Sequence, residues 1–301
     1  MPLIKTTDKI FVAGHKGMAG SSIIRSLKKY NYQNILTCTR KEVDLTDTNQ
    51  VSNWFEKNSP NVVVLAAAKV GGIYANKTYP NEFLMENLKI QSNVIENSFK
   101  NGVNRLLFLG SSCIYPKYCD QPIKEDYLLT GSLESTNEAY ALAKITGIKQ
   151  CSFLRKQYDF DAISLMPTNL YGPNDNYHPE NSHVLPALIR RFSEAKLNNA
   201  PFVICWGSGS PLREFLHVDD LGDAAVFALM EWDPNQKASP KDDQGRLLDY
   251  LNVGSGKDIS IFDLAHLVAN EIGYQGEINW DKEKPDGTPK KQLDVSRLNS
   301  L

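Results

Sequence analysis

The most informative segment of the chain reads Lys9-Ile10-Phe11-Val12-Ala13-Gly14-His15-Lys16-Gly17-Met18-Ala19-Gly20. Its apolar run is typical of a buried strand, and apolar residues recur at helical spacing after the last glycine. Glycines between a strand and a helix let the backbone approach a phosphate closely, and a helix N-terminus attracts anions. The segment therefore predicts a strand, a glycine turn and a helix that bind a dinucleotide. Alone, its GxxGxxG spacing fits a tight structural turn equally well.

The following segments repeat this alternation of strands and helices. Strands are predicted at residues 35–39, 62–65, 105–109 and 162–166, and the longest helical pattern runs from Phe83 to Phe99. Such alternation predicts an α/β fold with a Rossmann-type doubly wound parallel sheet. Ligands of such sheets lie outside the carboxyl ends of the strands, and the glycine turn falls at that edge.

The second strand is followed by Arg40 and not by an acid. An acid there would bind a ribose 2′-hydroxyl, whereas arginine can pair with a 2′-phosphate. NADP(H) is therefore favoured over NAD, with Lys16 as a second cation, unless Arg40 is simply a solvated surface charge. The turn at Asp44 and Leu45 is expected to cap the next helix, to lie against an adenine, or to do both.

The composition changes after residue 166. Residues 167–182 are rich in Pro, Gly and Asn, and shorter helical and strand patterns follow, interrupted by a hydrophilic excursion at residues 233–249. We expect an NADP-binding Rossmann domain made of residues 1–166 and about 200–232. Residues 167–199 and 233–301 are expected to form a smaller C-terminal α/β lobe that binds the substrate.

The overall composition excludes several classes of protein. The 301 residues are 42% hydrophobic and carry a formal net charge of -2, with scattered lysines and arginines, which argues against a nucleic-acid-binding protein. No segment resembles a signal peptide or a membrane span, so a cytoplasmic protein is expected. The five cysteines are odd in number and match no metal spacing, so we expect neither a disulfide framework nor a metal site.

Tyr140 and Lys144 lie in a segment with strong helical signals. Asn137 is a suitable N-cap, and apolar residues continue at helical spacing beyond Lys144. Residues four apart share one face of a helix, so the ammonium group is expected to lower the pKa of the phenol. Such a tyrosine can donate a proton to a carbonyl that is being reduced. An aromatic residue beside a solvated lysine is the commoner explanation of this pair when it is found alone.

The order and spacing of Gly14-x-x-Gly17-x-x-Gly20, Ser111 and Tyr140-x-x-x-Lys144 resemble the extended short-chain dehydrogenase/reductase family, in its nucleotide-sugar branch. Segments 110–116, 166–173, 181–191, 206–209 and 213–220 are similar to the GDP-4-keto-6-deoxy-mannose 3,5-epimerase/4-reductases of that branch. The resemblance extends from about Lys9 to the end of the chain. It implies an NADP-dependent enzyme that epimerises GDP-4-keto-6-deoxy-mannose at C3 and C5 and then reduces C4. Such enzymes usually continue into a further C-terminal helix, so the smaller lobe is expected to be short at its C-terminus.

The resemblance assigns the chemistry to five residues. Epimerisation needs a base and an acid on opposite faces of the sugar, for which the matching segments offer Cys113 as base and His183 as acid. Tyr140 would protonate the C4 oxygen with the help of Lys144, and Ser111 would hydrogen-bond the same oxygen. Without the resemblance, an inert thiol, an ordinary loop histidine and a turn hydroxyl would be the commoner roles of Cys113, His183 and Ser111.

Binding residues follow from the same matching segments. Guanidinium groups suit phosphate, so Arg191 and Arg213 are predicted to bind the diphosphate of the substrate. The further substrate-binding candidates are Asn169, Trp206 and Lys284. The cofactor is predicted to contact Gly14, His15, Lys16, Gly17, Met18, Gly20, Arg40, Asp44, Leu45, Lys144, Pro167, Asn169, Leu170 and His183. The stretch 282–291 is equally consistent with a loop over the substrate and with a solvated loop.

One helix also suggests an oligomer. The pattern from Phe83 to Phe99 has more apolar surface than one sheet contact needs, so a homodimer through this helix and the helix from Tyr140 to Gln157 is predicted.

Two alternatives stay open. A 4,6-dehydratase or 4-epimerase on the same scaffold would keep Tyr140 and Lys144, but a dehydratase needs a carboxylate beside the serine, where this chain has Ser112 and Cys113. A non-catalytic cofactor-binding member is the second alternative. The presence of the serine, the tyrosine and the lysine counts against it.

Overall fold

The computed structural model describes residues 2–179, 181–284 and 286–301, and it contains the predicted parallel sheet. Six strands lie in the order β2-β1-β3-β4-β5-β9, with every neighbouring pair parallel. Their bounds are Ile35–Leu36 for β2, Ile10–Ala13 for β1, Val62–Leu65 for β3, Arg105–Leu109 for β4, Ala162–Pro167 for β5 and Tyr250–Val253 for β9. The predicted doubly wound α/β class is confirmed. The strand order reverses between β1 and β3, which is where such sheets bind their ligands.

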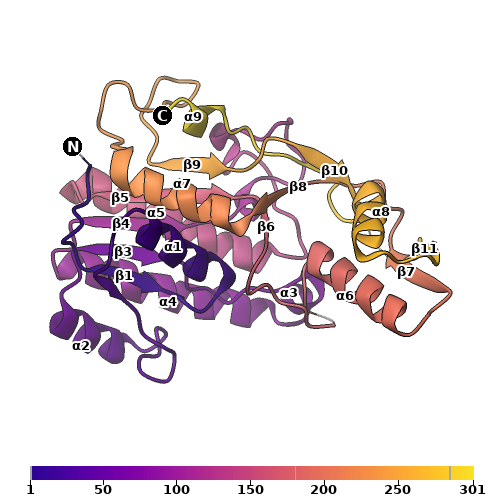
Figure 1. Ribbon diagram of the computed structural model, residues 1–301. Helices are drawn as coiled ribbons and strands as arrows, with labels where there is room; N and C mark the ends of the chain where they lie inside the picture. Colours follow the sequence, from indigo (N-terminus) through magenta and orange to yellow (C-terminus); the bar gives the residue numbers. More distant parts are fainter. Residues whose placement is uncertain (1, 180, 285) are drawn as a thin grey trace.

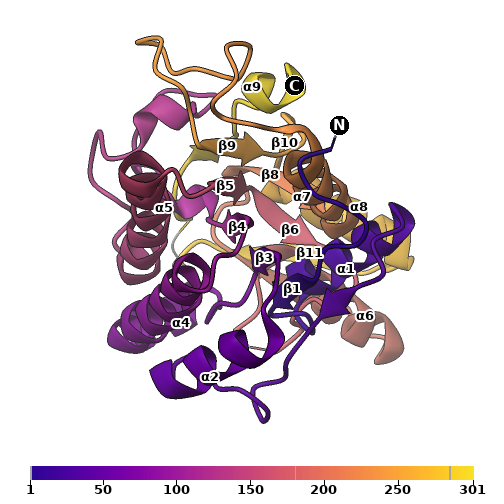
Figure 2. The same ribbon diagram turned by 90° about the vertical axis from the view of Figure 1, so that its left-hand side faces the viewer.

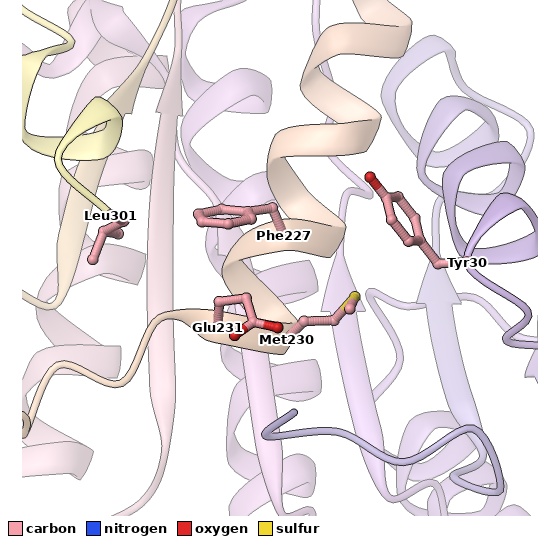
Figure 3. Close-up of a pocket in the computed structure, with 5 residues that line it drawn as sticks. All are labelled: Tyr30, Phe227, Met230, Glu231 and Leu301. Atoms are coloured by element: carbon pink, nitrogen blue, oxygen red, sulfur yellow. The ribbon is translucent and has the colours of Figure 1, made fainter. Parts of the chain in front are cut away.

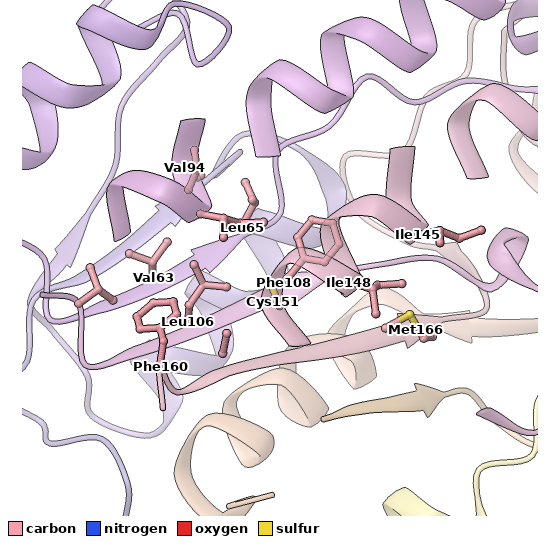
Figure 4. Packing of buried hydrophobic residues seen from close by; sticks show 14 of the residues in the cluster. Val63, Leu65, Val94, Leu106, Phe108, Ile145, Ile148, Cys151, Phe160 and Met166 are labelled. Carbon is pink, nitrogen blue, oxygen red and sulfur yellow. The ribbon is translucent and has the colours of Figure 1, made fainter. Parts of the chain in front are cut away.

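Helices cover both faces of this sheet (Figures 1 and 2). One face is covered by α1 (Met18–Lys29) and α7 (Val218–Glu231), and the other by α2 (Thr48–Asn58), α4 (Pro80–Lys100) and α5 (Glu138–Tyr158). Successive strand residues point to opposite faces. Val62 therefore shares a buried cluster with residues of α1 and α7, whereas Val63 shares one with residues of α4 and α5 (Figure 4). This explains why β1 and β3 are apolar along their whole length.

A smaller lobe lies at one end of the central sheet (Figure 1). In this lobe α6 (Val184–Leu197) and α8 (Ile261–Ile272) pack around a third buried cluster with β7 (Phe202–Trp206) and its parallel partner β11 (Glu277–Asp281).

The strand β8 (Leu212–His217) connects the lobe to the main domain. It pairs with β6 (Asn169–Tyr171), β10 (Asp258–Ser260) and β12 (Lys290–Lys291). Leu216 of β8 packs in a buried cluster of the main domain, while Phe215 packs against the cluster of the lobe.

Two strands belong to a different domain from the one predicted for them from the sequence. β7 was expected in the Rossmann domain, but its buried residues Val203 and Cys205 belong to the cluster of the lobe. β9 was expected in the lobe, but it pairs with β5 as the sixth strand of the central sheet. Strand patterns of four or five residues do not indicate which sheet a strand joins. What each part binds remains a proposal.

Several short elements were not predicted. They are α3 (Ile73–Thr78), α9 (Ser296–Asn299), the strands β6, β10 and β12, and the 3₁₀ turns η1 (Ser112–Ile114) and η2 (Glu125–Tyr127). β2 is also shorter than the expected 35–39. Among the helices of the described residues, none combines the length and the apolar character needed to cross a membrane.

Candidate active site

The glycine turn after β1 has the geometry of a phosphate-binding turn. Gly14 has a φ of +88°, and a Cβ atom there would lie 2.7 Å from the backbone nitrogen of Ala67. A Cβ at Gly20 would lie 2.2 Å from the carbonyl oxygen of Gly14. Gly17 precedes α1 and offers no side chain to its first turn, so the N–H groups there can bind an anion. The turn therefore fits a dinucleotide, with His15 and Lys16 within it and Met18 as the first residue of α1.

Arg40 lies in an exposed position after β2. Its Nε is 3.6 Å from Oδ2 of Asp44, and its side chain is 74% exposed, so it is accessible to a phosphate. Hydrogen bonds from the backbone and hydroxyl of Thr46 lower the pKa of Asp44. Asp47 caps α2 by accepting from two backbone N–H groups. The turn thus caps the helix, as predicted, while a contact of Asp44 or Leu45 with adenine stays a prediction.

Ser111 and Cys113 lie together just after β4. The Ser111 Oγ atom is 2.8 Å from the Cys113 Sγ atom, and the backbone N–H of Cys113 donates to the same hydroxyl at 3.4 Å. The turn η1 therefore brings the two side chains to the carboxyl edge of the sheet. Cys113 is partly accessible, unlike the buried Cys38, Cys151 and Cys205.

Tyr140 and Lys144 lie on α5, which begins directly after Asn137, as predicted. The Asn137 side chain makes no capping hydrogen bond. The Lys144 ammonium donates to the carbonyl oxygen of Leu109 at 2.8 Å and lies 5.8 Å from the centre of the Tyr140 ring. This carbonyl ends β4, so α5 brings both residues next to Ser111.

The prediction that Lys144 lowers the pKa of Tyr140 is wrong for this structure. Desolvation and the neighbouring Cys113 raise the pKa of Tyr140, and a hydrogen bond with Ser111 acts in the opposite direction. Desolvation lowers the pKa of Lys144 to about 8, with Cys113 opposing. Burial therefore affects these two pKa values more than the attraction between the two side chains does, because Lys144 is only 3% exposed. Tyr140 consequently stays protonated at neutral pH, as a proton donor must.

His183 is the residue that precedes α6 at its N-terminus. The backbone N–H of Gly72, in the loop after β3, donates to the Asn181 carbonyl at 3.1 Å. A Cβ atom at Gly72 would lie 2.7 Å from the carbonyl oxygen of Ser182. The segment before His183 is therefore held at the edge of β3, the strand beside β4. Desolvation lowers the pKa of His183, and Asp175 opposes this shift.

The predicted substrate-binding residues of the lobe gather around Trp206. The guanidinium carbon of Arg191 lies 5.0 Å, and the Lys284 ammonium 5.6 Å, from the centre of the Trp206 ring. Arg191 Nη1 also donates to the Ile204 carbonyl at 3.1 Å. Trp206 is 55% exposed, so its ring is free to stack on a ligand.

The loop that contains Lys284 lies against the turn after Trp206. Asp286 accepts from the backbone N–H of Ser208 at 2.7 Å and from its hydroxyl at 2.8 Å. Pro285, which belongs to the predicted stretch 282–291, lies outside the described residues. The hydrogen bonds of Asp286 attach this loop to the turn after Trp206, and whether the loop covers the substrate stays a prediction.

Lys291 was not predicted as a site residue. It pairs in register with Arg213 across β12 and β8, and it is close enough to Cys113 to interact with its charge. Within the described part of the chain, neither Arg213 nor Lys291 has an acidic partner within 4.0 Å, whereas Lys290 pairs with Asp258 at 3.0 Å. Glu134 acts on both cations without a direct ion pair, and Asp286 also acts on Arg213; an anion bound between the two cations is a prediction. The sequence held no signal for this, because it does not indicate which of two adjacent lysines faces the site.

The remaining predicted residues follow β5. Pro167 ends that strand, and Asn169 and Leu170 form most of β6. The Asn169 side-chain amide donates to the Glu214 carbonyl at 2.8 Å, so it also holds β6 and β8 together. Its contacts with cofactor or substrate stay predictions.

One surface hollow lies away from these residues. Tyr30 follows α1, Phe227, Met230 and Glu231 belong to α7, and Leu301 ends the chain (Figure 3). None of the predicted site residues lines it.

The parallel sheet, its glycine turn and the Ser-Tyr-Lys set at one edge define a short-chain dehydrogenase/reductase of the extended type. Residues 10–239 match the NAD dependent epimerase/dehydratase family, and the chain belongs to that family.

Curated relatives and a solved structure resemble nearly the whole chain. GDP-L-fucose synthase 1 of Arabidopsis thaliana is 56% identical over 97% of this chain and 87% of its own length. GDP-L-fucose synthase of Escherichia coli is 51% identical over 98% of this chain and 90% of its own length. The NADP-bound GDP-mannoheptose C4 reductase MlghC of Campylobacter jejuni is 35% identical, with a TM-score of 0.86 over 99% of this chain and 93% of that one.

Proposed function

We propose that this chain has GDP-L-fucose synthase activity, converting GDP-4-keto-6-deoxy-D-mannose to GDP-L-fucose by 3,5-epimerisation and NADPH-dependent reduction at C4. The observation that supports this most strongly is the identity of 51% and 56% with GDP-L-fucose synthases of a bacterium and a plant over nearly the whole chain. The contact between Ser111 and Cys113 beside Tyr140 supports a two-stage reaction at one site.

Epimerisation uses groups on two neighbouring loops. Cys113, as thiolate, removes the proton from the carbon next to the C4 ketone, and the Ser111 hydroxyl hydrogen-bonds the resulting enolate oxygen. His183 returns a proton to the opposite face of the same carbon. The lowered pKa of His183 makes it a ready proton donor once it is charged.

Reduction uses the groups of α5. NADPH, when bound, supplies the hydride that is transferred to C4. Tyr140 holds its proton at neutral pH and gives it to the developing alkoxide, while Ser111 keeps its hydrogen bond to that oxygen. Lys144 lies on the same face of α5, from which its ammonium can hold the nicotinamide ribose.

The cofactor and the nucleotide of the substrate bind to opposite parts of the molecule. Gly14, Gly17 and Gly20 let the dinucleotide phosphates approach the N-terminus of α1, and Arg40 and Lys16 pair with the 2′-phosphate. On the lobe, Arg191, Arg213 and Lys291 are the cations for the diphosphate of GDP, and Trp206 is the surface for guanine.

A homodimer through α4 and α5 belongs to the same proposal. These helices pack side by side, and Met85, Leu142 and Phe153 are 41%, 42% and 63% exposed on them. Burial of such side chains favours association. Phe153→Asp should convert a dimer to a monomer in light scattering, and a wild-type monomer would refute the dimer.

The activity is tested by following NADPH absorbance with GDP-4-keto-6-deoxy-mannose in deuterated water. We expect stoichiometric NADPH oxidation and deuterium at both C3 and C5 of the product. A 36% identity with GDP-L-colitose synthase of Yersinia pseudotuberculosis makes another GDP-sugar synthase the second candidate. Reduction without deuterium at these carbons would identify a plain 4-ketoreductase, and no oxidation at all would identify a non-catalytic protein.

A further inference from the structure

Glu214 of β8 is a buried carboxylate for which the reaction gives no direct role. It is 0% exposed, and it has no basic partner within 4.0 Å among the described residues. Its Oε2 atom accepts from the backbone N–H of Leu293 at 2.7 Å, and its Oε1 atom accepts from that of Gly256 at 2.7 Å. Burial of an unpaired charge is costly, so these hydrogen bonds must support a particular arrangement.

The carboxylate joins three segments that are distant in the sequence. Gly256 lies between β9 of the central sheet and β10, and Leu293 lies two residues after β12. β12 pairs with β8 over only two residues, so the strand has few bonds of its own. A Cβ atom at Gly254 would lie 2.2 Å from Oε1 of Glu214, which shows how closely the chain after β9 surrounds the carboxylate.

Strand geometry directs Glu214 and Arg213 to opposite faces of β8, because successive side chains alternate. β12 shows the same alternation. Lys290 pairs with Asp258, and the Gln292 amide donates to the Gly256 carbonyl at 2.6 Å. The side chains of Lys290 and Gln292 therefore point toward the segment that contains Gly256 and Asp258. Lys291 lies between them in the sequence and interacts with Arg213 and Cys113 instead.

Arg213 and Lys291 are therefore like charges in register on neighbouring strands. Such pairs repel each other and weaken the pairing of their strands. Glu134 acts on both cations and offsets part of this repulsion, and the remainder is opposed by bonds on the opposite face of the strands. The bond from Leu293 to Glu214 does this, since it ties the chain just after Lys291 to the residue next to Arg213.

We infer that Glu214 is a positioning residue that holds Arg213 and Lys291 side by side to bind the diphosphate of the GDP-sugar. The inference rests on the proposed function. The proposed role of Glu214 is in the affinity for the nucleotide diphosphate and not in hydride transfer. Lys144 on α5 bonds the Leu109 carbonyl, whereas Glu214 bonds the backbone of Gly256 and Leu293.

The test is Glu214→Gln in the full chain. The amide can accept only one of the two backbone N–H groups through its oxygen, so one bond is lost. We expect the KM for GDP-4-keto-6-deoxy-mannose and the Kd for GDP to rise about tenfold. The kcat and the Kd for NADPH should stay within about twofold of the wild type. If the KM and the Kd for GDP do not change, the inference is wrong.

Glu125→Gln is the matched control. Glu125 is also buried, at 1% exposure, and accepts from the backbone N–H of Asn252 at 2.9 Å while pairing with Arg297. Glu125 bonds neither Gly256 nor Leu293, the two backbone partners of Glu214, so this variant should lower the Tm without raising the KM. A similar loss of Tm with an equal rise of KM in both variants would mean that Glu214 is only structural.

A double-mutant cycle distinguishes positioning from an independent effect. If Glu214 acts through Lys291, Lys291→Ala and the double variant with Glu214→Gln should have the same KM within about twofold. A further rise in KM of about tenfold in the double variant would overturn the inference. If Glu214→Gln does not fold, Gln292→Ala is the second variant, because it removes the hydrogen bond from Gln292 to the Gly256 carbonyl. This variant should also raise the KM for the GDP-sugar. An unchanged KM would overturn the inference. Failure of the wild-type protein to bind GDP would refute the proposed function instead.

Discussion

The hydroxyl of Ser111 lies 2.8 Å from the sulfur of Cys113, in the turn that follows β4. One hydrogen-bonded pair thus combines a group that can bind the C4 oxygen with a group that can remove the proton from the neighbouring carbon. Because Tyr140 also interacts with Ser111, the C4 oxygen need not move between the two stages.

Cys113→Ser should abolish proton exchange at C3 and C5 while the reduction of an already epimerised 4-ketone continues. A serine hydroxyl has a far higher pKa than a thiol and is a poor base without further activation. Deuterium incorporation, measured by mass spectrometry, checks the first part, and NADPH oxidation checks the second. Cys119→Ser is the control, since the Cys119 thiol donates to the Pro116 carbonyl oxygen and has no role in either step, so this variant should keep both activities. Loss of both activities in Cys113→Ser would contradict the division of roles.

Tyr140→Phe should show the opposite pattern. Removal of the proton donor should lower the rate of C4 reduction by roughly 10²- to 10⁴-fold, while deuterium exchange at C3 and C5 persists. Single-turnover oxidation of bound NADPH measures the reduction. Tyr118→Phe, at a side chain that is 77% exposed, is the matched control. If reduction continued at the normal rate in Tyr140→Phe, the phenol would not be the donor.

Burial of Lys144 predicts a defined dependence of stability on pH. Its pKa is lowered from 10.5 to about 8, so between these values the unfolded chain keeps a proton that the folded protein releases. The contribution of Lys144 to the free energy of unfolding therefore rises with pH, by about 3 kcal/mol across this window. Urea denaturation without nucleotide measures this effect in the wild-type protein and in Lys144→Met. Between about pH 7 and 10.5, the free energy of unfolding of the wild-type protein should rise by this amount relative to that of the variant. A constant difference between the two proteins would show that the pKa is not lowered.

Arg40→Ala should weaken the binding of NADPH and leave that of NADH nearly unchanged. Only NADPH has the 2′-phosphate with which this exposed guanidinium can pair, and loss of a charge-assisted contact is expected to raise the Kd about tenfold. Fluorescence titration of the two cofactors measures the difference. Lys41→Ala, at the neighbouring exposed residue, controls for a general loss of positive charge. Equal effects of Arg40→Ala on both cofactors would contradict the assignment.

Much of the fold could be predicted because its signals are local. The strand at residues 62–65 is apolar throughout, and the helix α5 begins directly after Asn137, as its helical signals predicted. The strands β6 and β12 were missed, since two or three residues become a strand only when a distant partner such as β8 pairs with them.

The identity of several site residues could be predicted from the sequence, but their pKa values could not. The glycine turn, Ser111 and Tyr140 have recognisable spacing, whereas the pKa of a phenol depends on burial that only the fold provides. The expected effect of Lys144 on Tyr140 was wrong for this reason. The pair of Lys291 with Arg213 and the carboxylate of Glu214 were not predicted, because they depend on the register of strands about 80 residues apart.

The pairing of β9 with β5 has a practical consequence for dissecting the molecule. A fragment that ended at residue 239, where the match to the family ends, would lack the last strand of the central sheet. β5 would then be an edge strand paired only with β4, and the buried cluster of Ile163 and Leu165 would lack its members from β9; such edges promote aggregation. The nucleotide-binding half should therefore be soluble only when residues 250–253 are supplied, either in the same polypeptide or by a circular permutation that brings them forward.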